Sequence, residues 1–211
     1  MKKVLYFFVI SILFLSCTNN CPDKYNNIKV SKIILFEDIG LENFTCTGIT
    51  YDQTDNCFWI CDYGALNPEE FTYPKLVSID TSITKKICEI DLSSCIGEGM
   101  HNIQGICFDK KTNCFYIADG NNIIVIDKTP ILINQIDVSR YGIVANGICI
   151  TEDDTLFVLG YNSFLLHLNK NGTLLEKKQF DFPNQNMLTI YNNYLYATVG
   201  ADYEGDNNYL A

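Results

Sequence analysis

The sequence predicts an all-β fold, a β-propeller of four-stranded antiparallel blades. The first observation is a repeat, because GICFDKKTNCFYIADG from Gly105 recurs upstream as GITYDQTDNCFWICDYG from Gly48 and downstream as GICITEDDTLFVLGY from Gly147. Gly105 follows Gly48 by 57 residues and Gly147 follows Gly105 by 42, spacings typical of propeller blades. The second observation is composition, since 13% of the residues are aromatic, which favours strands.

Each copy combines short apolar strands with polar turns, so the repeats divide the chain. We expect a propeller over residues 28–211, with repeats near 45–92, 102–138, 146–182 and 186–211. Residues Ile28 to Glu37 are interpreted as the outer strand of the final blade, which closes the ring. About three and a half repeats cannot form a ring, so the chain is interpreted as incomplete, from a truncated reading frame. A partner chain or a smaller irregular closure is the alternative.

The first 16 residues, MKKVLYFFVISILFLS, predict a secretion signal. They have a basic start and an apolar stretch too short to span a membrane comfortably. The following FLSC, Phe14 to Cys17, resembles the lipobox of bacterial lipoproteins. The resemblance implies a signal peptide over 1–16, a lipid on Cys17 and a tether over 17–27. Because Thr18 is not aspartate, it also implies anchoring to the outer membrane of the cell envelope, facing the periplasm or the surface.

Charge and cysteine positions exclude some partners and sites. The formal net charge is −10 with no basic stripe, which argues against a nucleic-acid partner. Cys57 and Cys114 hold equivalent places in the repeat, as do Cys107 and Cys149, and this indicates small buried hydrophobic residues. Zinc binding by Cys57 and Cys61 is excluded, since one strand would hold them about 13 Å apart. Bridges remain open for three other cysteines in an oxidising compartment: Cys46, Cys88 and Cys95.

Two motifs resemble known propeller families. The stretch Phe115 to Asp127, FYIADGNNIIVID, resembles the NHL repeat, and Asn146-Gly147-Ile148 resembles the Asn-Gly-Leu of SMP-30/gluconolactonase-like six-bladed propellers. The second resemblance implies a metal-dependent hydrolase with a divalent cation such as calcium, held by residues before the glycines and by an Asp ending a second strand. The matching positions here are Gln104, Asn146 and Asp119. None of the glycines that open the repeats, Gly48, Gly105 and Gly147, is preceded by Glu.

The predicted binding face lies where first strands begin and second strands end. If strands alternate in direction, these points share one end of each blade, near the axis. Amides and carboxylates gathered there can coordinate a hard cation or bind a polar ligand. The alternative is that they satisfy backbone groups at strand ends. The candidate ligand-binding residues are Thr47, Asp62, Tyr63, His101, Gln104, Asp119, Asn121, Asn146, Tyr161 and Asn186.

No catalytic residue is identified, because the chain has no Gly-x-Ser-x-Gly motif, no glycine loop for phosphate and only two histidines. We therefore predict an exported, lipid-anchored propeller that binds a protein, a glycan or a small molecule. The alternatives are an SMP-30/gluconolactonase-like hydrolase and a non-functional fragment of a longer propeller. Asp52 and Asp109 are predicted to cap turns at the opposite end, and Trp59 to lie in the blade core.

Overall fold

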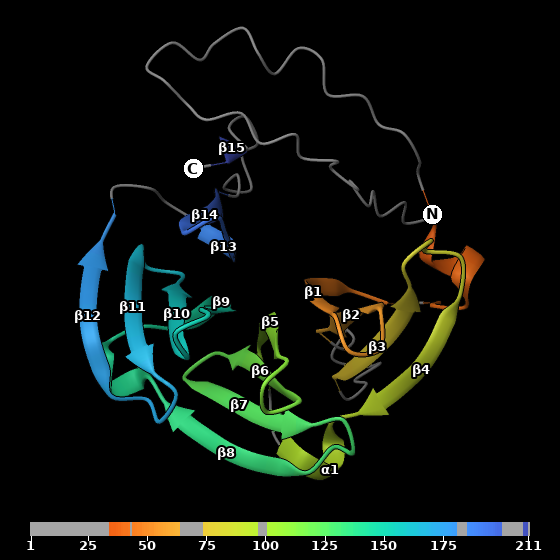
Figure 1. Ribbon diagram of the computed structural model, residues 1–211, viewed down its shortest axis with the longest axis horizontal. Coiled ribbons are helices and arrows are strands. Elements are labelled where there is room, and N and C mark those ends of the chain that lie inside the picture. The colour runs from red at the N-terminus through yellow and green to blue at the C-terminus, as the bar shows by residue number, and fades with distance from the viewer. Residues whose placement is uncertain are drawn as a thin grey trace, which may run out of the picture.

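A computed structural model describes residues 34–42, 44–63, 74–96, 101–180, 185–199 and 209–210. Within these residues, antiparallel sheets follow one another along the chain and cover an open arc around a common axis (Figure 1). The first three sheets have four strands each, in chain order from the axis outward. The predicted all-β class and the four-stranded blades are confirmed.

The strand bounds agree with the repeats read from the sequence, and the helices are short. Blade 1 contains β1 (Cys46–Asp52), β2 (Cys57–Asp62), β3 (Lys75–Asp80) and β4 (Lys86–Asp91); blade 2 contains β5 (Ile103–Asp109), β6 (Cys114–Asp119), β7 (Asn122–Asp127) and β8 (Leu132–Asp137); blade 3 contains β9 (Ala145–Ile150), β10 (Thr155–Gly160), β11 (Phe164–Asn169) and β12 (Leu174–Gln179); blade 4 contains β13 (Gln185–Tyr191), β14 (Tyr194–Val199) and β15 (Tyr209–Leu210). The helices are η2 (Phe36–Ile39), α1 (Ser93–Ile96) and η4 (Ser139–Tyr141).

The core consists of the layers between neighbouring blades. Between blades 1 and 2, the Trp59 ring meets Phe115 edge-on with centroids 4.9 Å apart, and Cys57 and Cys61 are buried beside them. Each large apolar side chain buried in such a layer contributes roughly 1.5–3 kcal/mol. The predicted core positions of Trp59 and of the repeat cysteines are confirmed. All cysteines of the described part are free thiols, including Cys46, Cys88 and Cys95.

The glycines that open repeats 1 and 2 are required because first strands of adjacent blades approach closely. A Cβ atom on Gly105 would lie 2.5 Å from the backbone oxygen of Asn146, and one on Gly48 would lie 2.8 Å from that of Gln104. Real Cβ atoms do not come this close to backbone, so a side chain here would push the blades apart. The repeated Gly-Ile is thus a packing signal.

The strand predicted over Ile28 to Glu37 is wrong in its described part. Phe36–Ile39 form the 3-10 helix η2, which ends at Gly40 in the left-handed conformation with φ 76°. Its apolar side chains do not pair as a strand but bury against the outer face of blade 1, on Ile60, Val77 and Ile79. In Figure 1 the segment lies beside β3 and β4. Residues 28–33 lie outside the described part.

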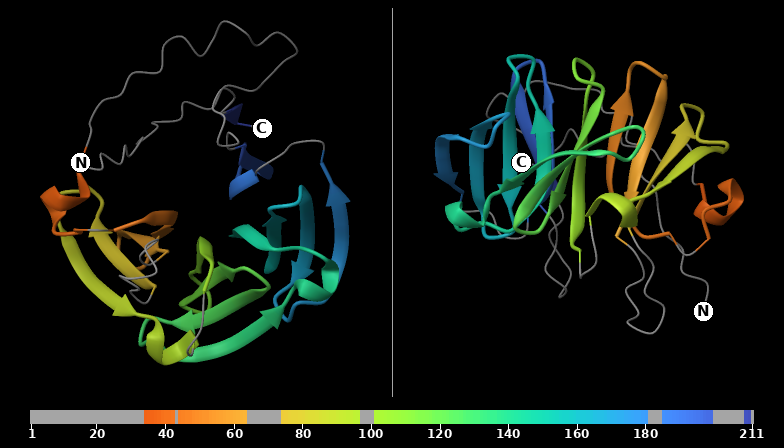
Figure 2. Two further views of the ribbon diagram at one scale, coloured as in Figure 1. Left: turned by 180° about the vertical axis from the view of Figure 1, so that it is seen from behind. Right: turned by 90° about the horizontal axis from the view of Figure 1, so that it is seen from below.

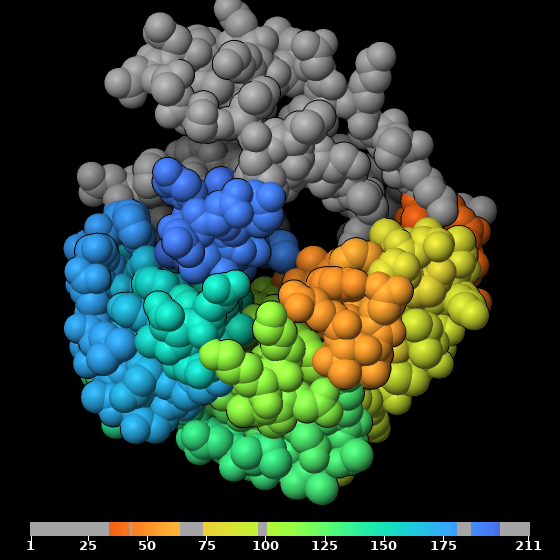
Figure 3. Space-filling view, in the orientation of Figure 1, coloured from red at the N-terminus to blue at the C-terminus, as the bar shows by residue number. Residues whose placement is uncertain are grey.

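The described residues do not close a ring, and they do not include the N-terminal segment. No strand of blade 1 pairs with a strand of blade 4 there, and Figure 3 shows the blades side by side around the arc. The signal peptide over 1–16, Cys17 and the tether over 17–27 all lie outside the described residues. No helix in the described part is long and apolar enough to cross a membrane.

Candidate functional site

Strand register brings the predicted site residues to one end of the blades. The start of each first strand pairs with the end of the second: Cys46 with Asp62 and Ala145 with Gly160. Blade 2 follows the same register, with Ile103 opposite Asp119. The side view in Figure 2 shows the strands running along the axis, from one face of the arc to the other, and these two faces are the two ends of every blade. The inferred geometry of this end is therefore observed.

Two carboxylates at this end hold the backbone that leads into the first strands. Asp62 is 2% exposed and accepts a hydrogen bond from the Thr45 N–H at 2.9 Å. Asp119 accepts the equivalent bond from the Asn102 N–H at 2.6 Å. Thr45 and Asn102 each stand three residues before the repeat glycine, so the two acids have the same structural role. Without them these N–H groups would lose a partner, at a cost of about 1–3 kcal/mol.

Blade 3 has no carboxylate at the end of its second strand. Gly160 stands where the other two blades have their acid, and a Cβ there would lie 2.9 Å from the Cβ of Ile143. Ile143 is buried and fills the space that a carboxylate would need. The absence of an acid at Gly160 is thus compensated by packing.

In blade 2 the acid has a second partner, His101. Its Nδ1 lies 2.8 Å from Oδ2 of Asp119, and the two side chains are only 11% and 9% exposed. His101 stands four residues before its glycine, where blades 1 and 3 have the apolar Phe44 and Ile143. Blade 2 alone of these three places a polar pair there.

The His101–Asp119 pair lines a groove of about 420 Å³. The loop at Gly120 and Asn121, which lines the groove, is held by two backbone hydrogen bonds. The Ala145 N–H donates to the Gly120 oxygen at 2.6 Å, and the Val138 N–H donates to the Asn121 oxygen at 2.9 Å. The first of these bonds joins blade 2 to blade 3. The lining residues are Cys95, Ile96, His101, Asn102, Asp119, Gly120, Asn121, Asn122, Ile124, Leu132, Gln135 and Val144.

Three predicted site residues share this groove: His101, Asp119 and Asn121. Gln104 adjoins it, because its amide nitrogen donates to the Asn102 side chain at 2.7 Å. Thr47 is instead used between blades, its hydroxyl donating to the Ile103 oxygen at 2.9 Å. Four others lie at the same end outside the groove lining: buried Asp62, buried Asn146, Tyr63 on blade 1 and the exposed Tyr161 on blade 3. Asn186 belongs to β13, but its side chain lies outside the described part.

The predicted cation ligands Gln104, Asn146 and Asp119 come from neighbouring blades. Gln104 lies on β5 and Asn146 on β9, the innermost strands of blades 2 and 3. Both carboxylate oxygens of Asp119 are already hydrogen-bonded, to His101 and to the Asn102 N–H. Calcium takes six to eight oxygen ligands. The described residues contain no group of three or more His, Cys, Asp or Glu side chains that could hold a metal ion. Cation binding stays a prediction.

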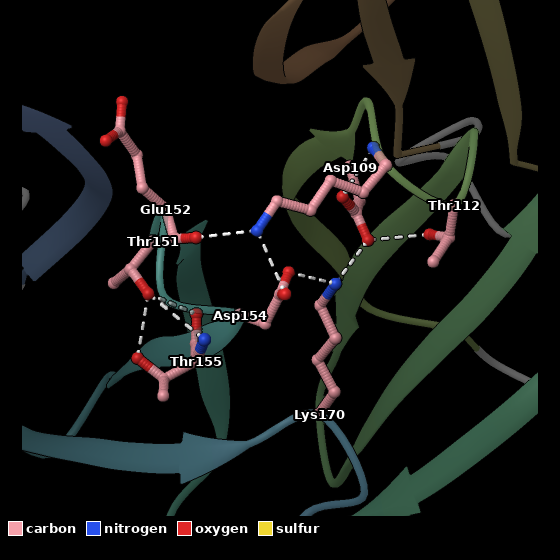
Figure 4. Close-up of polar contacts among 8 residues, drawn as sticks. Asp109, Thr112, Thr151, Glu152, Asp154, Thr155 and Lys170 are labelled. Carbon is pink, nitrogen blue, oxygen red and sulfur yellow. Dashed lines mark hydrogen bonds and ion pairs between the residues drawn. The ribbon is translucent and has the colours of Figure 1, made fainter.

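The opposite end carries an ionic network that the sequence analysis missed. Lys170 of blade 3 bridges Asp109 of blade 2 and Asp154 of its own blade, with both N–O distances 2.6 Å (Figure 4). Lys128 of blade 2 bridges Asp52 and Asp55 of blade 1 in the same way. We call these two clusters the interblade latches. Both lysines directly follow the last residue of a third strand, and this shared position is the signal that could have revealed them.

The ion pairs of the latches shift the pKa values of the acids and lysines that form them. Burial is the largest influence on Asp109 and would raise its pKa, but the hydrogen bonds from Lys170, Thr112 and Lys111 and the charge of Lys170 together outweigh it, so the pKa is lowered. The pKa of Lys170 is raised despite burial, because Asp109 and Asp154 stabilise its charge. Asp52 and Lys128 shift in the same directions for the same reasons. The predicted turn-capping role is also confirmed, since Asp52 accepts from the Thr54 N–H and Asp109 from the Lys111 N–H.

Comparison with solved structures decides the architecture. Glutaminyl cyclase from Myxococcus xanthus matches with a TM-score of 0.55 at 14% identity, over 74% of this chain and 62% of that chain. A protein of unknown function from Bacteroides caccae matches with 0.51 at 9% identity, over 81% and 61%. The WD40 domain of Neurospora crassa Pan2 matches with 0.51 at 13% identity, over 74% and 44%.

The fold is a β-propeller. The chain spans about three fifths of the length of the first two matching proteins. At these identities the likeness shows the propeller fold alone. No protein-family model and no protein of known function matches the sequence. The function of this propeller must therefore be argued from its own residues.

Proposed function

We propose that this propeller is a binding module whose ligand occupies the groove of His101 and Asp119. The observation that carries the proposal is the groove itself. It has a volume within the range of about 300–1,000 Å³ usual for ligand sites, and a buried polar pair opens onto it beside a hydrogen-bonded backbone. A site of this kind is already formed before a ligand arrives.

The lining indicates the chemistry of the ligand. Asn102, Asn121 and Gln135 offer amides, each able to donate and to accept hydrogen bonds. Ile124 and Val144 offer apolar surface beside them. Among the described residues, the lining has no lysine or arginine, and the carboxylate of Asp119 is already paired with His101. The ligand that fits is a neutral one that carries hydroxyl or amide groups and an apolar edge, either as a small molecule or as part of a glycan or protein.

Export and a lipid anchor belong to the same proposal. They are supported by the basic and apolar start of the chain and by FLSC at Phe14 to Cys17. Kinship with NHL-repeat and SMP-30/gluconolactonase-like propellers is supported by the motifs at Phe115 to Asp127 and Asn146 to Ile148. The hydrolase alternative has no observation of its own in its favour, since Gly160 stands where blades 1 and 2 have an acid, and Asp119 is engaged by its neighbours.

A thermal-shift screen of the purified protein tests the binding site. The probes are neutral mono- and disaccharides and N-acetylated dipeptide amides, because these carry the groups that the groove can bind. A ligand at a hundred times its Kd stabilises a protein by about 2.7 kcal/mol, so a hit raises the Tm by several degrees.

A groove-filling variant locates each hit. Val144 is 43% exposed at the edge of the groove, so Val144→Trp obstructs the groove without disturbing the core. Gln53→Ala at the opposite end is the matched control. We expect Val144→Trp to abolish the shift and the control to keep it. An equal shift in both variants would place the ligand elsewhere and overturn the assignment.

A further inference from the structure

The outer strand of blade 2 differs from the other outer strands in charge. Outer strands are sheet edges, which proteins commonly protect with charged side chains. On β4, Glu89 pairs with Lys75 and Lys86, and on β12 Glu176 pairs with Lys178. From Leu132 to Ile136, β8 reads LINQI and has no charged residue.

This edge also exposes consecutive apolar side chains. Ile131, Leu132 and Ile133 are 57%, 43% and 56% exposed. Figures 1 and 3 show blade 2 (green) with β8 at the outer margin of the molecule, where no other described element covers it. Only one apolar residue is comparably exposed on β4, Ile87 at 53%. The edge of β8 is thus both uncharged and apolar.

The backbone of β8 is available for pairing on its outer side. β8 ends the order of its sheet, with Asn134 opposite Val125 of β7. The Gln135 N–H is turned to the neighbouring Asn134 side chain at 2.9 Å, so it is not part of the β7–β8 ladder. The register of the β7–β8 ladder shifts between Leu132 and Asn134, which leaves Ile133 as an extra residue without a partner on β7.

Charge around the edge selects the partner. Asp127 precedes β8 and Asp137 is its last residue. Backbone hydrogen bonds to Asp127 and the Ser139 side-chain bond to Asp137 lower the pKa of each, so both stay ionised. The nearby Lys128 is neutralised by Asp52 and Asp55 in its latch. A second copy would bring like acidic flanks together in a chain of net charge −10.

We propose that β8 is a docking strand for an extended segment of a partner protein. The segment has β-branched or other apolar side chains flanked by lysine or arginine, and it adds to the sheet as an outer strand. Main-chain hydrogen bonds along the outer side of β8 supply affinity, with a backbone oxygen of the segment replacing the Asn134 side chain as acceptor of the Gln135 N–H, and the basic flanks meet Asp127 and Asp137. The proposal does not require the groove of His101 to bind anything, although Leu132 and Gln135 line both surfaces.

A labelled peptide in which Val and Thr alternate between pairs of lysines is the probe, titrated into the purified protein by fluorescence anisotropy. Two control peptides replace the lysines by glutamates, or the central Val by Pro, which removes a donor and disfavours strand pairing. The matched protein variants are Ile133→Lys on β8 and Ile87→Lys at the equivalent place on β4. We expect Ile133→Lys to weaken binding at least about tenfold and Ile87→Lys to change it less than about twofold.

Several results would overturn the proposal. They are absence of saturable binding to the wild-type protein, equal loss in the two variants, and equal binding of the lysine and proline peptides. Sedimentation that shows a wild-type dimer lost in Ile133→Lys would assign the edge to a second copy instead. Ile133 is mostly exposed, so Ile133→Lys should keep the wild-type Tm within about 2 °C. If it does not, Gln135→Lys repeats the test at a second exposed position.

Discussion

Replacing Lys170 by Met should destabilise the protein through the carboxylate that it leaves behind. The Asp109 side chain is only 4% exposed, and after the change it keeps just the Lys111 N–H and the Thr112 hydroxyl as partners. Breaking a fully buried ion pair costs about 3–5 kcal/mol. Because the Lys170 side chain is 23% exposed, water screens part of the pair, and we expect a loss of about 2 kcal/mol.

Urea unfolding followed by the fluorescence of Trp59, the single tryptophan, measures this loss. In a thermal scan it corresponds to a drop in Tm of roughly 4–8 °C for a chain of this size. The double variant Asp109→Asn with Lys170→Met removes the uncompensated charge and should recover part of the stability. Lys178→Met is the matched control, since its pair with Glu176 is exposed.

The reasoning fails if Lys170→Met unfolds within about 0.5 kcal/mol of the wild type, which is the range of an ordinary surface change. It also fails if the double variant is less stable than Lys170→Met alone, because a stranded charge could then not be the cause. A loss in Lys178→Met equal to that in Lys170→Met would indicate an effect of net charge.

Three more predictions follow from the structure, and a fourth follows from the sequence. Because the pKa of Asp109 is lowered on folding, its stabilising contribution is present above the unfolded pKa of about 3.9 and is lost on acidification; because the pKa of Lys170 is raised, its contribution is present below about pH 10.4 and is lost in alkali. The urea midpoint should therefore be constant between about pH 5 and 9. A midpoint that falls within this range would contradict the prediction. Gly105→Ala should cost at least about 3 kcal/mol or prevent folding, and a wild-type Tm would show that the blades can separate. Calcium should bind with a Kd of about 10⁻³ M by titration calorimetry, since the one carboxylate expected among its ligands, Asp119, is engaged, and micromolar binding would refute this. Cys17→Ala should release the protein from bacterial membranes in fractionation, and retention there would rule out the lipid anchor.

The fold could be read from the sequence because two signals agree in the first three repeats. Alternating strands separated by turns indicate antiparallel sheets, and the recurring glycine marks where neighbouring first strands approach. The shared end of Asp62 and Asp119 followed from strand direction alone. These are properties of one repeat and its copies, so a single sequence contains them.

What could not be predicted depends on contacts between repeats or outside them. The partnership of Lys170 with Asp109 requires the offset between adjacent blades, which no strand pattern encodes. The apolar run around Phe36 has strand composition, but without a neighbouring strand its side chains bury best as a cover on blade 1. The pairing of His101 with Asp119 likewise depends on how the chain enters blade 2.

The position four residues before the repeat glycine gives this architecture a way to change its chemistry cheaply. It is occupied by Phe44, His101 and Ile143 in successive blades, while the hydrogen-bonded ladder beside it is the same. Where the acid at the end of the second strand is kept, a single substitution at this position replaces an apolar packing residue such as Phe44 by a histidine that can pair with the acid. Duplicated blades can therefore diverge independently at this position. A polar site can be gained or lost there while the fold of the blade is kept.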